Sequence, residues 1–106
     1  MDKLEEEMAA YCIFDIKEVI DSEKMANYRQ QVGQSVAHYG GRFLAAGGPF
    51  DVVEGNWQPV YPVIIEFPDL ETAHQWSDSD EYSEAKALRL EAASADAVFI
   101  AGLGSH

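Results

Sequence analysis

The sequence has few basic residues, a single cysteine and no long apolar run. Lys and Arg total 7 against 19 Asp and Glu, which gives a formal net charge of −12. Nucleic acids and anionic membrane surfaces are bound through basic faces, so this charge argues against both classes of partner. No apolar stretch reaches the roughly 20 residues that a transmembrane helix requires.

The one cysteine, Cys12, excludes an intrachain disulfide and lies within an apolar run, as a small buried hydrophobic residue would. The acidic segment 1–7 lacks the apolar core of a secretory signal, so we expect a cytoplasmic protein. We expect residues 1–7 to be a short acidic extension or a remnant of expression. Residues 8–103 are expected to form a single α+β domain, and residues 104–106 a C-terminal tail.

Hydrophobic residues are abundant, at 47% of 106 residues, which is enough for one modest core without metal or disulfide staples. Residues 10–16 are β-branched and aromatic and predict a first strand. Asp21 or Ser22 can cap a helix, which Gly40 and Gly41 end. The helix carries an apolar stripe with a 3.6-residue period, formed by Met25, Tyr28, Val32, Val36 and Tyr39.

The second half of the chain continues this alternation of strands and helices. Paired glycines and Pro49 interrupt a strand that begins at Arg42, so we expect a bulge or bend there. Ser79 has the character of a fresh N-cap, so the second helical region breaks near it. The remaining predicted elements are a strand at 42–46 that continues at 51–54, a strand at 61–67, helices at about 69–77 and 80–93, and a strand at 96–101. The order is βαββαβ, which predicts an α+β domain with a four-stranded antiparallel sheet.

The sheet predicted from this pattern is apolar on both of its faces. Strands 63–67 and 97–101 carry apolar side chains on both of their faces. In a sheet that is solvated on one face, apolar residues alternate with polar ones along each strand. The helices cover only one face of such a sheet. We therefore expect a second copy of the chain to cover the other face, sheet against sheet, in a two-fold homodimer.

No strong catalytic motif is present. The sequence has no Gly-x-Ser-x-Gly, no phosphate-binding glycine loop and no His-Glu-x-x-His. Its two internal histidines show no ligand spacing, and His106 is terminal. We therefore expect neither a metal site nor a cofactor.

Aromatic and charged residues supply the candidates for a binding site. Trp57, Trp76 and Tyr82 either pack in the core or form the walls of a pocket between sheet and helices. Glu66 lies inside an apolar strand, so its carboxylate needs a cation or a proton, and Arg42 or Arg89 could be that cation. The predicted ligand-binding residues are Arg42, Glu54, Trp57, Glu66, Trp76, Tyr82 and Arg89. The candidate general acids or bases, if they face the pocket, are His38, Glu66 and His74.

An ordered set of short motifs carries a family resemblance. They are Tyr39-Gly40-Gly41-Arg42-Phe43-Leu44, Gly47-Gly48, Glu54-Gly55-x-Trp57-x-Pro59, Ile65-Glu66-Phe67-Pro68, Ala73, Trp76, Ser79-x-Glu81-Tyr82 and Arg89. From Met8 to about Leu103 the chain resembles the bacterial family called domain of unknown function 1330 (DUF1330). The resemblance implies a ferredoxin-like βαββαβ unit that pairs as a dimeric α+β barrel, and it implies no established activity.

Two functions remain open at this point. The superfamily that the resemblance implies includes cofactor-independent monooxygenases, isomerases and haem-degrading proteins, which favours binding or conversion of a small apolar or aromatic molecule. The alternative is a non-catalytic homodimeric module in which the same aromatic residues serve packing. A cavity between sheet and helices favours the first function, and a filled core favours the second.

Overall fold

The structure is a computed structural model that describes residues 8–103. Its elements in chain order are β1 (Ala10–Val19), α2 (Ser22–His38), β2 (Arg42–Ala46), β3 (Pro62–Phe67), α3 (Leu70–Ser77), α4 (Asp80–Ala92) and β4 (Ala93–Ala101). The predicted βαββαβ order and the α+β class are confirmed. The predicted extension at 1–7 and the tail at 104–106, with His106, lie outside the described residues.

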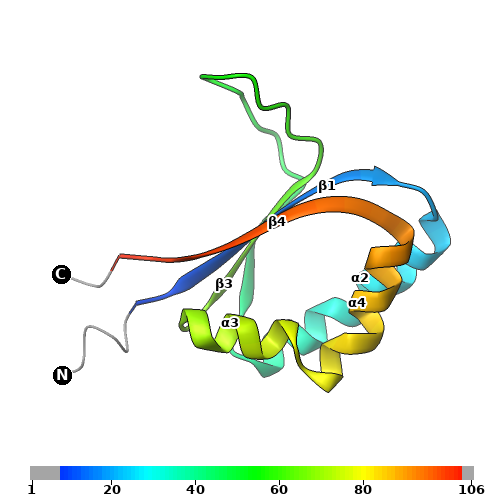
Figure 1. The fold of residues 1–106 in the computed structure, drawn as a ribbon, viewed down its shortest axis with the longest axis vertical. Helices are drawn as coiled ribbons and strands as arrows, with labels where there is room; N and C mark the ends of the chain where they lie inside the picture. Colours follow the sequence, from blue (N-terminus) through cyan, green and yellow to red (C-terminus); the bar gives the residue numbers. More distant parts are fainter. Residues whose placement is uncertain (1–7, 104–106) are drawn as a thin grey trace.

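The four strands form one antiparallel sheet in the order β2-β3-β1-β4. In the centre of the sheet, Cys12 of β1 lies opposite Ile65 of β3 on one side and opposite Phe99 of β4 on the other. All three helices lie against one face of this sheet (Figure 1). We call this the helical face and the opposite side the open face. No helix in the described part of the chain is long and apolar enough to cross a membrane.

Side-chain caps set the start of each helix where the sequence predicts it. The carboxylates of Asp21 and Asp69 accept from the backbone N–H groups of Lys24 at 3.0 Å and Thr72 at 2.7 Å. Ser79 Oγ accepts from the Tyr82 N–H at 3.1 Å, which confirms the break between α3 and α4. Such caps satisfy donors that the first helical turn leaves unpaired.

The core lies between the helical face of the sheet and the helices. The predicted stripe of α2 is buried against the strands at Met25, Tyr28, Val32 and Val36, and Tyr39 is half-buried. From the sheet, the alternate residues of β1 and β3 point into the same layer: Cys12, Phe14, Ile16, Val63, Ile65 and Phe67. Burial raises the pKa of the Cys12 thiol to about 12, so this cysteine acts as a packing residue.

The predicted continuation of the second strand at 51–54 is wrong, because these residues form no strand. Residues 47–61 form an irregular loop that extends from the sheet on the side away from the helices (Figure 1). The hairpin ladder ends where the Gly47 N–H donates to the Pro62 carbonyl at 2.8 Å, and Gly47 has a left-handed φ of 70°. Beyond that bond no neighbouring strand is available for the two valines of 51–54, because β3 is already paired on both sides.

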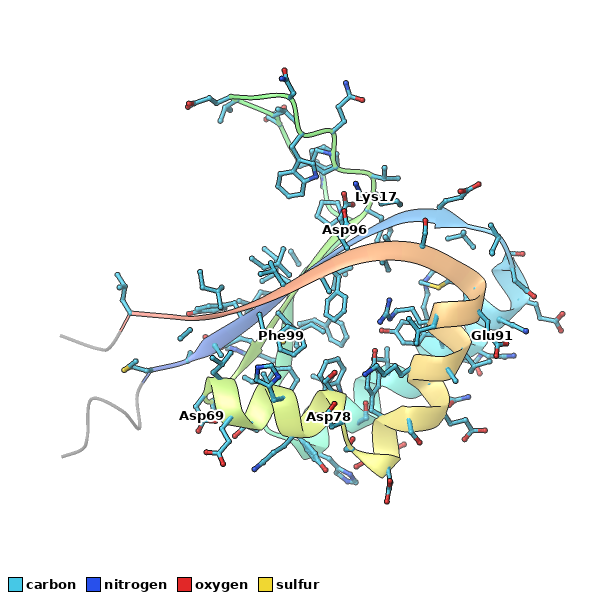
Figure 2. The ribbon with its side chains drawn as sticks, viewed as in Figure 1. Lys17, Asp69, Asp78, Glu91, Asp96 and Phe99 are labelled. Atoms are coloured by element: carbon cyan, nitrogen blue, oxygen red, sulfur yellow. The ribbon has the colours of Figure 1, made fainter. Side chains whose placement is uncertain are left out.

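The open face carries the other set of alternating side chains. They include Ile13, Ile64, Glu66, Val98 and Ile100, of which Val98 is 55% and Ile100 53% exposed. Figure 2 shows the two sides of β4: Phe99 points toward α3, and Asp96 lies on the other side of the strand. The predicted two-sided apolar sheet is therefore present in the structure of one chain.

Candidate functional site

A cavity of about 260 Å³ lies between α2 and the helical face of the sheet. We call it the α2 pocket. Its walls come from α2 and from the first three strands, with Arg89 of α4 and Tyr61 of the 47–61 loop, and most of the side chains that line it are apolar or aromatic. No acidic residue lines the α2 pocket, and its charged groups are Arg29 and Arg89. Ligand sites are concave and mainly apolar with a few polar groups, and the α2 pocket has this character.

The helical period of α2 explains how the pocket forms. Met25, Tyr28 and Val32 point toward the sheet from successive turns, and Gly33 follows them with no side chain. A Cβ built on Gly33 would meet nothing within 4 Å, so this glycine leaves space that any other residue would occupy. A glycine inside a helix lowers the stability of the helix by about 1 kcal/mol relative to alanine. At position 33 this loss accompanies an open space beside the helix.

Arg89 lies on the last turn of α4 and is only 7% exposed. Its guanidinium carbon lies 5.3 Å from the centre of the Phe14 ring, which is a cation–π contact. Its Nε is buried without a hydrogen-bond partner, and among the described residues no carboxylate forms an ion pair with it. A buried guanidinium normally has a carboxylate partner, so Arg89 is the most unusual polar group of the site.

Tyr28 lies beside Arg89 and packs against Tyr82. Their hydroxyl oxygens are 3.5 Å apart, and their rings meet edge to face. Burial raises the pKa of Tyr28 far above its ordinary value, and the neighbouring Tyr82 acts in the same direction, while the charge and hydrogen bond of Arg89 act against both. Tyr28 is therefore a neutral phenol that can donate a hydrogen bond at the pocket wall.

Arg29 is the second cation of the α2 pocket. It is exposed, and its guanidinium carbon lies 5.8 Å from the centre of the Tyr61 ring, which also lines the pocket. The exposure of Arg29 places it on the solvent side of the pocket, and the burial of Arg89 places that group on the inner side. The lining of the α2 pocket thus contains one exposed and one buried cation.

The structure brings Glu66 together with Arg42 and away from Arg89. Arg42 Nε lies 2.7 Å from Glu66 Oε1, between paired positions of β2 and β3 on the open face. The expectation that Glu66 lies in the pocket between sheet and helices is thereby corrected. In β3 the side chains of Ile65 and Phe67 are buried on the helical face. Because side chains alternate along a strand, Glu66 between them points to the open face.

Trp57 and Glu54 belong to the 47–61 loop rather than to the α2 pocket, and both are exposed. The Trp57 indole N–H donates to the Asp15 carboxylate at 3.4 Å, and the backbone N–H groups of Val60 and Tyr61 donate to it at 2.9 Å each. Trp57 borders a hollow of about 130 Å³ beside β1 and β4 on the open face.

Asp15 is buried at the point where the 47–61 loop meets the sheet. Burial raises the pKa of its carboxyl group. The hydrogen bonds from Val60, Tyr61 and Trp57, together with the charge of Lys17, outweigh that effect and lower the pKa of Asp15 below its ordinary value. Asp15 was not among the predicted site residues, and it anchors the loop.

The two remaining aromatic candidates, Trp76 and Tyr82, are core residues. Their rings stack at 4.1 Å between centres, and the Trp76 indole N–H donates to Ser35 Oγ at 3.0 Å. Neither lines the α2 pocket, although Tyr82 reaches it indirectly through Tyr28. Packing therefore accounts for both side chains.

The predicted acids and bases also lie away from the α2 pocket. His38 Nδ1 is 2.6 Å from Glu81 Oε2 on the outer surface of the helices, and His74 is exposed on α3 with its ring 5.2 Å from that of Phe99. No cluster of three or more metal-ligating side chains occurs within residues 8–103. The structure thus assigns no general acid or base to the pocket from among the predicted three.

Of the seven predicted ligand-binding residues, Arg89 is the one that lines the α2 pocket. Tyr28, Arg29 and Gly33 are not among the predicted site residues, because the sequence pattern of α2 predicts only a core helix. A glycine next to the buried stripe of a helix, with an arginine one turn before it, was the available signal for a space at that position.

The comparisons with known proteins agree with this fold. A family model described as a domain of unknown function (DUF1330) matches residues 9–103. The chain belongs to this family. A search of curated proteins finds no match to the sequence.

Solved structures share the fold of this DUF1330 chain at low sequence identity. RPA0582, a protein of unknown function from Rhodopseudomonas palustris, has a TM-score of 0.70 and 17% identity over 89% of this chain and 82% of its own. SnoaB, a cofactor-independent oxygenase from Streptomyces nogalater, has a TM-score of 0.57 and 8% identity over 88% of this chain and 89% of its own.

A third structure, a dimeric ferredoxin-like protein of unknown function from Thermobifida fusca, has a TM-score of 0.50 and 13% identity over 89% of this chain and 91% of its own. At identities this low the likeness concerns the fold alone. The predicted ferredoxin-like class of the DUF1330 chain is confirmed.

Proposed function

We propose that the protein binds a small, mainly apolar or aromatic molecule in the α2 pocket. The observation that carries this proposal is a cavity of about 260 Å³ whose lining is apolar except at its two arginines and its tyrosine hydroxyls. Pockets for drug-sized ligands measure about 300–1,000 Å³, so the α2 pocket suits a smaller molecule, on the scale of a single aromatic ring with a short substituent.

Binding is the function that the geometry supports best. Catalysis by proton transfer requires an acid or base within hydrogen-bond reach of the ligand, and His38, Glu66 and His74 all lie elsewhere. The fold is shared with the oxygenase SnoaB, but folds of this kind host many activities, so the likeness alone does not extend that activity to this chain.

We propose that the functional unit is a homodimer formed through the open face. The support is the row of exposed apolar side chains on that face, with Val98 and Ile100 among them, and the dimeric state of the Thermobifida fusca protein of the same fold. Exposed apolar patches of this kind typically mark interaction sites, and two-fold pairing is the commonest arrangement. This arrangement leaves the α2 pocket on the other side of each sheet.

The test of pocket binding is a titration of the isotope-labelled protein with indole, phenylacetate and benzyl alcohol, followed by amide chemical shifts. We expect saturable shifts at α2 and at the facing residues of β3. The matched variant Gly33→Leu fills the space beside the helix and is expected to abolish those shifts while the helix remains folded. Shifts confined to the hollow beside Trp57, or no saturable binding by any of the three compounds, would contradict the proposal.

A further inference from the structure

The distribution of positive charge singles out the α2 pocket. Of the seven Lys and Arg residues in the chain, one, Lys3, lies outside the described residues, which leaves six. Three of the six pair with carboxylates, and a fourth donates to a backbone carbonyl. Lys17 pairs with Asp96 at 3.0 Å, Lys24 with Glu91 at 2.6 Å and Arg42 with Glu66 at 2.7 Å, and Lys86 donates to the Ser77 carbonyl at 3.3 Å.

The two that remain, Arg29 and Arg89, line the same cavity. Neither arginine forms an ion pair with a carboxylate of the described residues, although the chain has 19 acidic residues. The acidic residues are instead kept out of the pocket lining. The α2 pocket is therefore a local positive site within a strongly negative protein.

Arg89 is built to receive an anion. Its side chain is 7% exposed, lies over the Phe14 ring and has a buried Nε with no partner. A guanidinium offers donors in a planar fork that matches the two oxygens of a carboxylate. The hydroxyl of Tyr28, which also lines the pocket, adds a neutral donor next to that fork.

We propose that the ligand of the α2 pocket is a carboxylic acid with an aromatic or apolar body, whose carboxylate is held by Arg89. This inference rests on the proposed binding function and names the chemical class of its ligand. One buried guanidinium matches a single negative charge, and the apolar lining matches the rest of the molecule. Arg29 on the solvent side raises the local concentration of anions, which the net charge of the chain would otherwise repel.

The test compares acids with amides of the same shape. Benzoate and benzamide, and phenylacetate and phenylacetamide, are titrated into the intact protein by calorimetry or by amide chemical shifts. We expect each acid to bind at least about tenfold more tightly than its amide, because hydrogen bonds to charged groups exceed those between neutral groups by about that amount. Added salt is expected to weaken binding of the acids and to leave the amides unaffected.

Variants assign the effect to Arg89. Arg89→Met keeps the length of the side chain and removes its charge, and it is expected to weaken binding of the acids by about 10- to 100-fold while binding of the amides is unchanged. Lys86→Met removes one positive charge from the same helix, one turn earlier and outside the pocket lining, and is expected to bind the acids as the parent protein does.

The outcomes separate this inference from the proposed function. Amides that bind as tightly as their acids overturn the carboxylate inference and leave pocket binding intact, and so does an Arg89→Met variant that binds the acids normally. Failure of all four compounds to bind overturns both. If Arg89→Met does not fold, the comparison of acids with amides on the parent protein still decides the inference, and Arg89→Lys is expected to retain part of the preference for acids.

Discussion

On the helical face of the sheet Arg89 is buried over Phe14 without a carboxylate, whereas on the open face Arg42 is exposed and paired with Glu66 at 2.7 Å. Stability alone would favour the reverse, because a cation in low dielectric needs a counter-ion more than a cation in water does. The unpaired charge of the helical face is the feature on which the proposed binding of an anionic ligand rests. On the open face the charge is neutralised, which suits the surface proposed to pair with a second copy of the chain.

The largest effect that we expect concerns the open face. Ile100 is 53% exposed in one chain, so Ile100→Asp is expected to fold normally, but in the proposed homodimer its carboxylate would be buried against the partner sheet. An unpaired buried charge costs several kcal/mol, so the dissociation constant of the dimer should rise by at least about 100-fold. Sedimentation equilibrium measures the mass in solution directly. Leu90→Asp, on the exposed side of α4, is the matched control and should remain dimeric, and a dimeric Ile100→Asp protein would contradict the sheet-to-sheet arrangement.

The second effect concerns Asp15, which anchors the 47–61 loop to the sheet. Asp15→Ala removes the acceptor of two backbone N–H groups and of the Trp57 indole. We expect the free energy of unfolding to fall by about 3 kcal/mol, because three part-buried donors lose the charged acceptor that they share. Urea denaturation measures the change. A loss below about 1 kcal/mol would mean that the loop reorganises and recovers those bonds with water.

The pH dependence of stability tests the same anchor. The pKa of Asp15 is lowered in the folded protein, so its contribution is complete above the ordinary carboxyl pKa of about 3.9 and is lost as the pH falls through the lower folded value. Asp15→Asn has no such group to protonate. Its unfolding free energy should therefore fall less steeply than that of the parent protein below about pH 4.

The third effect concerns the helical face. Gly33→Ala adds a methyl group to the middle of α2 where nothing lies within 4 Å, so no packing cost opposes the gain in helix propensity. We expect unfolding to require about 1 kcal/mol more free energy, measured by thermal or urea denaturation. Gly48→Ala, in the loop and equally free of contacts, is the control and should change little. A destabilised Gly33→Ala would show that the space beside α2 is narrower than the structure indicates.

The smallest effect concerns the ion pair of the open face. Glu66→Gln removes one charge from a pair whose arginine is largely exposed, and such pairs contribute about 0–1 kcal/mol. We expect the unfolding free energy to fall by less than about 1 kcal/mol and binding in the α2 pocket to remain unchanged. If this variant bound phenylacetate more weakly, Glu66 would belong to the ligand site, which would contradict its position on the open face.

The fold followed from the sequence because its signals are local. The stripe of α2, the three caps and the glycines after α2 depend on residues a few positions apart, and the structure contains all of them. The prediction of a strand at 51–54 failed, because the two valines of this segment have strand propensity but no neighbouring strand. Strand formation depends on a partner, which propensity does not supply.

The site followed less well, because it depends on which face of each strand meets the helices. The two faces of β3 were separable in the sequence, with Val63, Ile65 and Phe67 on one and Glu66 on the other. The fully apolar set identifies the buried face, and that rule alone would have moved Glu66 to the open side. The pocket itself arises from the missing side chain of Gly33 and the burial of Arg89, which only the packing of α2 and α4 reveals.

Cys12 gives the protein a practical advantage for spectroscopy. It is the one cysteine in the sequence, and its buried thiol has a pKa of about 12, so a maleimide dye at neutral pH finds almost no thiolate there. A cysteine substituted for Val53, which is 91% exposed in the 47–61 loop, becomes the reactive position without removal of the native one. In a homodimer, a donor dye on one loop and an acceptor dye on the other would report the distance between the two loops by fluorescence energy transfer.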